Sequence, residues 1–279
     1  MNKLYVSTLG LIVTNKCNLD CAHCLRGCKN NADMTDEVIK ATLSNLKGIG
    51  NLAICGGEPT MAIPVIEKIF DYVINNHIFL EEVTATINGT IYNDEFIKQL
   101  DVINNYILKY KELEKNRKSQ VEIVISLDNY HIDEIKRLNL DNIFKENINK
   151  YDKSIHFYGF RGFKKNMKLF REGNALNLPN NLTIDLRPMD ILVTYAGKNK
   201  KFDEQNGLCN IGPIITINTE GIVTECDASI ESQRTIYNYG NVLEENLEQI
   251  VLKRAKVLTP RKWNREFKKE LKRYDNYNK

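Results

Sequence analysis

The sequence predicts an α/β fold built on a parallel β-sheet, with a small β-hairpin and helix in its last third. The first observation is an alternation of short apolar segments with longer segments whose apolar residues recur at helical spacing. Strands that alternate with helices in this way form βαβ units, and such units build parallel sheets. The second observation is a hairpin pattern at 214–217 and 222–224, with Glu220-Gly221 at the turn.

The expected elements follow one another through residues 10–186. Strands are expected at 10–13, 51–54, 83–87, 121–127, 155–158 and 182–186. Helices are expected at 33–47, 64–76, 96–114 and 133–149. Acidic residues in the first turn favour the helix at 33–47, and Gly48 and Gly50 are expected to end it.

Composition limits the kind of protein. The chain has 279 residues, with 39 basic and 36 acidic side chains and a net charge of +3, so bulk charge indicates neither nucleic-acid nor membrane binding. No apolar run is long enough to span a bilayer, and residues 1–7 do not resemble a signal peptide. Seven cysteines, an odd number, favour metal binding in a reducing cytoplasm over a disulfide framework.

Three of those cysteines lie close together after the first expected strand. Cys17, Cys21 and Cys24 have C-x3-C-x2-C spacing. Soft thiolate ligands select iron–sulfur clusters, zinc or Cu(I), and three thiolates leave one iron of a [4Fe–4S] cluster open to another ligand. The alternative is a structural zinc site, which would need a fourth ligand such as Cys28 or His23.

A second motif agrees with the cluster interpretation. Cys55-Gly56-Gly57-Glu58-Pro59 follows the expected strand at 51–54. This segment resembles the GGEP motif of the radical S-adenosylmethionine (SAM) superfamily, and the cysteine loop resembles the cluster loop of the same superfamily. The resemblance implies a partial (βα)6 barrel in which Cys17, Cys21 and Cys24 hold a [4Fe–4S] cluster. It also implies that SAM chelates the fourth iron and that the GGE segment holds its amino group.

In parallel barrels, functional residues lie at the carboxyl ends of the strands. The resemblance therefore implies that polar groups there face SAM, although Asn-Gly and Asp-Asn are also ordinary turn formers. The implied SAM-binding residues are Gly56, Gly57, Glu58, Asn88, Ser126 and Asp128. Arg161 and Arg187 are candidates for binding the SAM carboxylate or a substrate anion, with a surface role as the alternative. His23 is expected to pack beside the adenine or the cluster.

The last third resembles part of the SPASM/twitch extension of that superfamily. Cys209, Gly221 and Cys226 match the opening C…G-x4-C half, and a helix is expected at 243–257. No cysteine follows Cys226, and two thiolates do not hold a [4Fe–4S] cluster well. A relic hairpin, or a substrate-covering cap without a cluster, is therefore favoured over an auxiliary Fe–S cluster, and simple burial of both cysteines is the alternative. Gly173-Asn174-Ala175 weakly resembles the Gly-Arg-Ala turn that precedes the last barrel strand in peptide-modifying members, with Asn174 in place of the arginine.

The C-terminal tail is basic, and Trp263, Phe267, Leu271 and Tyr274 recur in it at helical spacing. A helix that lays this aromatic stripe on the barrel is favoured over a nucleic-acid or partner-binding helix. The predicted division is a radical SAM core at 1–195, a twitch/SPASM-like extension at 196–258 and a basic helical tail at 259–279.

The function implied by the resemblance is the reductive cleavage of SAM to methionine and a 5′-deoxyadenosyl radical, which removes a hydrogen atom from a substrate. An electron donor of the flavodoxin or ferredoxin type would be required. The extension favours a peptide or protein substrate. The alternatives are a small-molecule dehydrogenase, epimerase or mutase and, in another class, a non-catalytic metal-binding scaffold.

Overall fold

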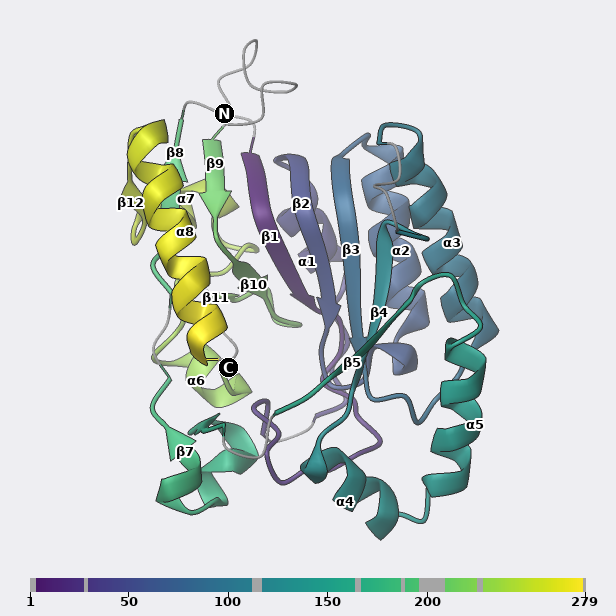
Figure 1. Cartoon of the computed structure of the whole chain (residues 1–279). Coiled ribbons are helices and arrows are strands. Elements are labelled where there is room, and N and C mark those ends of the chain that lie inside the picture. Colours follow the sequence, from purple (N-terminus) through teal and green to yellow (C-terminus); the bar gives the residue numbers. More distant parts are fainter. Residues whose placement is uncertain are drawn as a thin grey trace.

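The computed structural model describes residues 4–27, 30–111, 117–163, 167–186, 189–195, 209–224 and 228–277, with the backbone alone at 260 and 273–277. One large sheet organises the described residues, and its parallel strands β1 to β5 follow in sequence order (Figure 1). These strands are β1 (Leu4–Ile12), β2 (Leu46–Cys55), β3 (Phe79–Ile87), β4 (Val121–Ser126) and β5 (Phe157–Arg161).

The C-terminal strands extend this sheet beyond β1. Both β9 (Cys209–Gly212) and β10 (Ile215–Ile217) pair with β1 in parallel. The strand β8 (Leu192–Thr194) is antiparallel to β9, and β12 (Lys256–Val257) is parallel to β8 at the edge. The predicted hairpin is confirmed, because β11 (Val223–Thr224) pairs antiparallel with β10 and Gly221 has a φ of +83° at the turn. The extension is therefore continuous with the sheet of the first half.

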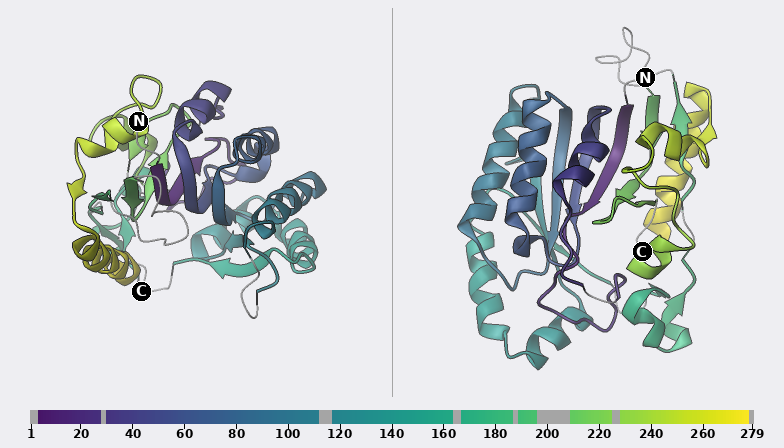
Figure 2. Two further views of the ribbon diagram at one scale, coloured as in Figure 1. Left: turned by 90° about the horizontal axis from the view of Figure 1, so that it is seen from above. Right: turned by 180° about the vertical axis from the view of Figure 1, so that it is seen from behind.

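Helices cover the two faces of the sheet unequally (Figures 1 and 2). One face is covered by α1 (Asp36–Leu43), α2 (Ile63–Asn75) and α3 (Asp94–Leu108), and α8 (Pro260–Tyr277) lies across the C-terminal strands on the other face. The remaining helices are α4 (Asn129–Arg137), α5 (Asp141–Tyr151), α6 (Ile230–Arg234), α7 (Leu247–Leu252) and the short 3-10 helices η1 (Pro59–Met61), η2 (Gly173–Asn177) and η3 (Asn180–Leu182). In the described ranges, every helix is too short or too polar to cross a lipid bilayer.

The core lies between the sheet and α1 to α3. Alternate strand residues such as Leu52 and Val83 are fully buried against the apolar face of α2, including Ile69 and Phe70. Burying one such side chain contributes about 1.5–3 kcal/mol, so this layer fixes the strand register. On the opposite face, residues such as Thr84 and Glu122 are only half-buried.

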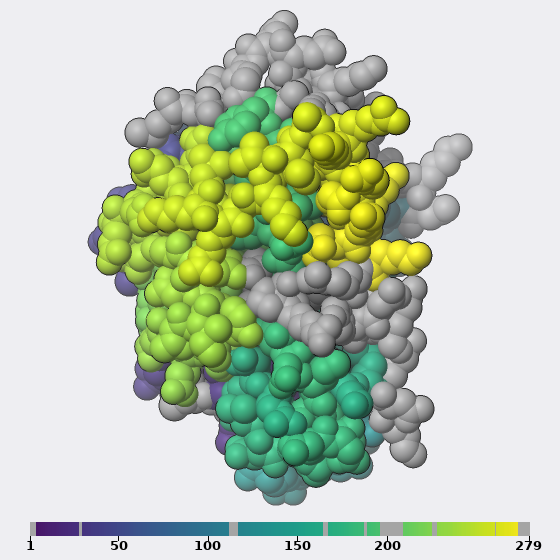
Figure 3. All heavy atoms as spheres, turned by 90° about the vertical axis from the view of Figure 1, so that its left-hand side faces the viewer, coloured from purple at the N-terminus to yellow at the C-terminus, as the bar shows by residue number. Residues whose placement is uncertain are grey.

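The predicted tail helix is confirmed, and the first two residues of its stripe, Trp263 and Phe267, pack inward. Trp263 is 4% exposed and stacks on Phe267, whose ring fills the space above Gly212 of β9. Leu271 is 37% exposed, and the side chain of Tyr274 lies outside the described residues. Figure 3 shows the yellow C-terminal segment on the upper part of one flank of the molecule.

Four sequence predictions were wrong in detail. Residues 133–149 form two helices, because Asn139 adopts a φ of +56° and asparagine tolerates this left-handed conformation. The expected sixth strand is reduced to β7 (Thr183–Ile184), which pairs with β6 (Leu169–Phe170) in a separate sheet. Gly48 and Gly50 lie inside β2, where a Cβ on either would be at most 2.6 Å from an atom of β1. The helix expected at 243–257 is confined to α7.

Candidate active site

The carboxyl ends of β1 to β4 meet at one edge of the sheet, and both sequence motifs lie there. The backbone after β2 continues along the cluster loop, here defined as residues 13–27. The amide of Gly57 donates to the carbonyl of Thr14 at 2.7 Å, and that of Glu58 donates to Lys16 at 2.7 Å. A Cβ on Gly57 would lie 2.1 Å from the Lys16 carbonyl oxygen. Glycine is therefore needed here for close approach of the loop backbone.

The three motif cysteines share this loop. Cys21 is buried, and Cys17 and Cys24 are half-buried. Burial raises the pKa of the Cys21 thiol, and the nearby thiols of Cys24 and Cys17 raise it further. The C-x3-C-x2-C spacing places the three thiols on one short loop, where as thiolates they would repel one another. A softly coordinating iron centre would relieve this repulsion, so the donor set fits an iron–sulfur cluster.

Helix α4 supports the loop from one side. The buried Glu134 accepts a 2.8 Å hydrogen bond from the amide of Asp20 and is held by Arg137, with contacts of 2.7 and 2.8 Å. Leu19 and Cys21 pack with Ile135 in a small apolar cluster. The sequence did not reveal this role of Glu134, because the two partners of the hydrogen bond are 114 residues apart.

Glu58 links the ends of β2 and β3. Its carboxylate is 1% exposed and accepts from the amide and hydroxyl of Thr60, at 3.1 and 2.6 Å, and from the amide of Asn88, at 2.7 Å. Burial raises the pKa of the Glu58 carboxyl, whereas these hydrogen bonds act in the opposite direction. Both of its oxygens hold the strand ends in place, and its expected contact with SAM stays a prediction.

Asn88 faces the cluster loop. Its Nδ2 donates to the Oδ1 of Asn18 at 2.9 Å and lies 3.9 Å from the Sγ of Cys17. Its Oδ1 accepts from the amide and hydroxyl of Thr90. An N–H group directed at a ligating sulfur is one of the features that set the potential of an iron–sulfur cluster.

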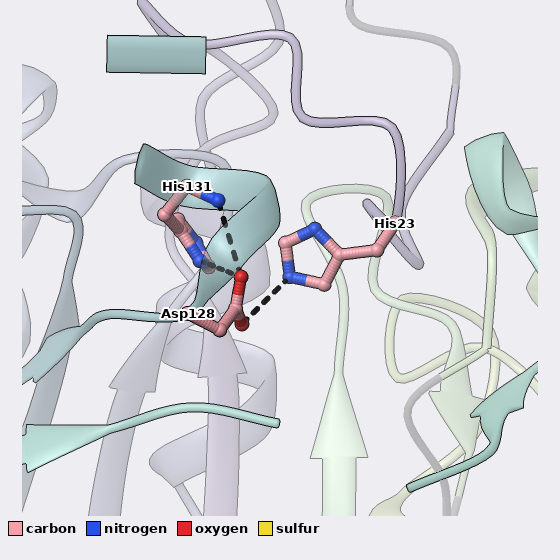
Figure 4. Close-up of side chains that lie close together, drawn as sticks. All are labelled: His23, Asp128 and His131. Atoms are coloured by element: carbon pink, nitrogen blue, oxygen red, sulfur yellow. Dashed lines mark hydrogen bonds and ion pairs between the residues drawn. The ribbon is translucent and has the colours of Figure 1, made fainter. Parts of the chain in front are cut away.

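Asp128, after β4, joins the loop to α4 (Figure 4). Its Oδ2 lies 3.3 Å from the Nε2 of His23, and its Oδ1 lies 3.0 Å from the Nδ1 of His131. The same Oδ1 also accepts a hydrogen bond from the backbone amide of His131 at 3.1 Å. Burial alone would raise the pKa of Asp128, but the two histidines outweigh it and hold this pKa well below its usual range.

The ligand atoms of His23, Asp128 and His131 lie within 4.8 Å of one another, which would allow a metal ion. The arrangement is equally that of a carboxylate shared by two imidazoles. The ring of His23 also stacks on Tyr130, with centroids 4.8 Å apart. His23 thus packs against the β4 end, and a SAM contact of Asp128 stays a prediction.

Ser126 and Arg161 are partners in the register of β4 and β5, so they lie side by side at the same edge. Arg161 is exposed. Arg187 lies outside the described residues, and so do Cys28 and Cys226. The zinc alternative that uses Cys28 and the auxiliary site that uses Cys226 both remain predictions.

Cys209 lies far from the motif cysteines. It pairs with Leu4, at the amino end of β1, and is fully buried in the main apolar core. Burial raises the pKa of its thiol to about 12, which keeps the thiol protonated at neutral pH. Cys55 ends β2, where its Sγ lies 3.4 Å from the carbonyl oxygen of Leu11.

Comparison with known proteins places the sequence motifs of this site in a known family. A family model described as the radical SAM superfamily matches residues 11–172, more than half of the chain. The chain is 31% identical over 139 residues to an uncharacterized protein of Methanocaldococcus jannaschii, which covers 44% of this chain and 49% of that protein. It is 28% identical over 212 residues to a GTP 3′,8-cyclase of Clostridium perfringens, with 71% of this chain and 58% of that protein covered.

Similar solved structures include anSMEcpe with bound AdoMet and the Cp18Cys peptide, with a TM-score of 0.44, 13% identity and coverage of 88% and 80% of the two chains. Streptococcus suis SuiB bound to the precursor peptide SuiA has a TM-score of 0.41 at 11% identity, with 88% and 64% covered. The match spans about half the length of the two curated relatives named above.

Proposed function

This chain belongs to the radical SAM superfamily, and on that premise we propose that it is an enzyme that modifies a peptide or protein. The observation that carries the enzyme assignment is the meeting of Cys17, Cys21 and Cys24 with the GGEP segment at the carboxyl ends of β1 and β2. When bound, a [4Fe–4S] cluster and SAM supply a one-electron reduction that splits SAM into methionine and a 5′-deoxyadenosyl radical, which abstracts a hydrogen atom.

The residues of this chain would bind and shield those groups. The three thiolates would hold three irons, and the Gly56–Glu58 backbone, fixed against the loop by two hydrogen bonds, would position the SAM amino group. Asn88 would orient the loop through Asn18. The apolar cluster around Leu19 and Ile135 would keep water away from one side of the site.

The C-terminal hairpin supports a peptide or protein substrate. It resembles the extension found in enzymes that act on peptides, and its turn reaches the site, since Thr219 accepts a 3.0 Å hydrogen bond from Asn15. The half-buried polar face of β3 and β4 is a surface on which an extended chain could lie. The cytoplasm, inferred from cysteine usage, would supply a flavodoxin- or ferredoxin-type electron donor.

The second candidate is a small-molecule substrate, and the similarity to GTP 3′,8-cyclase favours it. Anaerobic reconstitution with iron and sulfide, followed by turnover with SAM and dithionite, tests both. We expect 5′-deoxyadenosine and methionine to form. A peptide of changed mass supports the first candidate, and a changed nucleotide or other metabolite supports the second. A zinc-loaded protein that makes no 5′-deoxyadenosine would contradict both and favour a scaffold.

A further inference from the structure

The turn at Gly173-Asn174 touches the cluster loop from the side opposite α4. The backbone amide of Asn174 donates to the carbonyl of Cys24 at 2.9 Å. Its side-chain Nδ2 donates to the carbonyl of Cys21 at 3.0 Å and lies 3.3 Å from the Oδ1 of Asp20. One residue thus binds the backbone of two of the three motif cysteines, from about 150 positions away in the sequence.

Two glycines allow this approach. Gly173 has a φ of +53°, and a Cβ there would lie 2.5 Å from the carbonyl oxygens of Cys24 and Leu25. Gly27 has a φ of +71°, and its Cβ would lie 2.9 Å from the Cα of Gly173. Backbone packs directly on backbone here, so a side chain at either position would push the turn off the loop.

The C-terminal region completes this contact. The buried carboxylate of Glu172 accepts a 3.1 Å hydrogen bond from the amide of Ser229, which caps α6. Arg26 donates to the carbonyl of Ala228 at 3.1 Å and accepts from the amide of Ile230 at 3.3 Å. The cluster loop, the 172–174 turn and the start of α6 therefore each contact the other two, and Figures 1 and 2 show α6 next to the segment between β6 and β7.

We propose that Asn174 is a positioning residue of the cluster loop, which fixes the peptide groups of Cys21 and Cys24 and couples them to the C-terminal region. The inference rests on the proposed cluster at Cys17, Cys21 and Cys24. Groups around a metal site orient its ligands, and their loss typically lowers metal affinity by about 10–100-fold. In this chain, hydrogen bonds from the 172–174 turn and from α6 hold the loop in place.

The test compares Asn174→Ala and Asn174→Asp with the wild-type holoenzyme. Alanine removes both side-chain donor contacts and leaves the backbone bond to Cys24. Aspartate keeps the size but places a carboxylate opposite Asp20 and the Cys21 carbonyl, so it loosens the loop at least as much. Asn174 is half-exposed, so neither variant leaves a buried cavity. The matched control is Asn180→Ala, an exposed asparagine in η3 that accepts from Arg171 at 2.7 Å.

Three readouts do not depend on any substrate: iron release to a chelator, the electron paramagnetic resonance spectrum of the reduced cluster, and its midpoint potential. We expect iron release to be about 10–100-fold faster in both Asn174 variants. We also expect a more positive potential, because a looser loop admits water, which stabilises the more highly charged reduced cluster. Asn180→Ala should match the wild type.

Folded Asn174 variants that release iron at the wild-type rate, with an unchanged spectrum and potential, would overturn the inference. A wild-type protein that takes up no iron–sulfur cluster would instead contradict the proposed function. The two failures are therefore distinguishable in one series of samples.

Discussion

The two ends of the sheet use cysteine in opposite ways. At the carboxyl ends of the strands, Cys17, Cys21 and Cys24 share a loop held by hydrogen bonds from several distant segments. At the amino ends, Cys209 lies beside Leu4 as one more apolar side chain of the core. A cysteine pattern therefore supports the prediction of a metal site more strongly where the cysteines share a loop at the carboxyl ends of the strands than where one lies in the apolar core.

The largest expected effect separates these two kinds of cysteine. Replacing Cys17, Cys21 or Cys24 by alanine should abolish both the iron–sulfur absorption and 5′-deoxyadenosine formation, because two thiolates do not hold the cluster. Cys209→Ala should keep the wild-type iron content and lower the free energy of unfolding by about 1 kcal/mol, through loss of a small buried group. Iron analysis and denaturant unfolding measure the two outcomes. A Cys209 variant that lost half of its iron would show that the amino end also binds metal.

The next test concerns the backbone contact that brings GGEP to the loop. Gly57→Ala would place a Cβ 2.1 Å from the Lys16 carbonyl oxygen, so the loop must shift. We expect a loss of about 1–3 kcal/mol in stability and weaker iron retention. Gly10→Ala is the matched control, since its Cβ would lie 3.0 Å from the Thr216 hydroxyl and no part of the loop would move. Equal iron retention in the two variants would contradict the role assigned to this contact.

A substitution of Glu58 tests whether the stability of the strands' carboxyl ends depends on a buried carboxylate. In Glu58→Gln one acceptor oxygen becomes an NH2 group that faces the donors of Asn88 or Thr60. Two buried donors that face each other without an acceptor lower the free energy of unfolding by about 1–3 kcal/mol. Denaturant unfolding of the apoprotein measures this, with the exposed Glu95→Gln as a control that should leave the unfolding midpoint near the wild-type value. An unchanged Glu58→Gln midpoint would show that the carboxylate has no structural role.

The apolar pattern of the sequence predicted those helices and strands that bury one continuous face. The helices near 64–76 and 96–114 and the strands β2 to β4 were found from apolar periodicity, because each buries one continuous face. The wrong sixth strand and the missed strands β8, β9 and β12 are two to four residues long, and only pairing with distant strands defines them. Short strands of this kind carry little periodicity of their own.

The residues of the candidate site likewise fall into those that local spacing predicts and those that only the folded chain brings together. The motif cysteines and Glu58 were predicted from local spacing, whereas the contacts of Glu134 and Asn174 with the loop span 114 and about 150 residues. Cys209 was grouped with Cys226 from spacing alone. Its burial follows from the parallel pairing of β9 with β1, which no local signal predicted.

The smallest expected effect lies at the amino end, where His156 joins Ser119, at 2.8 Å, to Asp101, at 2.9 Å. Burial lowers the pKa of His156 more than Asp101 raises it, so the folded chain takes up this proton at a lower pH than the unfolded chain, whose histidine titrates near 6.5. Between those two pKa values the unfolded state binds more protons, so stability falls as the pH drops below about 6.5. This single histidine changes the free energy of unfolding by at most about 1.4 kcal/mol per pH unit.

Urea unfolding of the apoprotein between pH 5 and 7 should therefore show a shallower pH dependence in His156→Gln than in the wild type. His77→Asn is the control, because this exposed residue after α2 has a φ of +52° that asparagine accepts readily. An equal slope in His156→Gln and the wild type would assign the acid sensitivity to other groups. It would also mean that the pKa of His156 does not differ between the folded and unfolded chains.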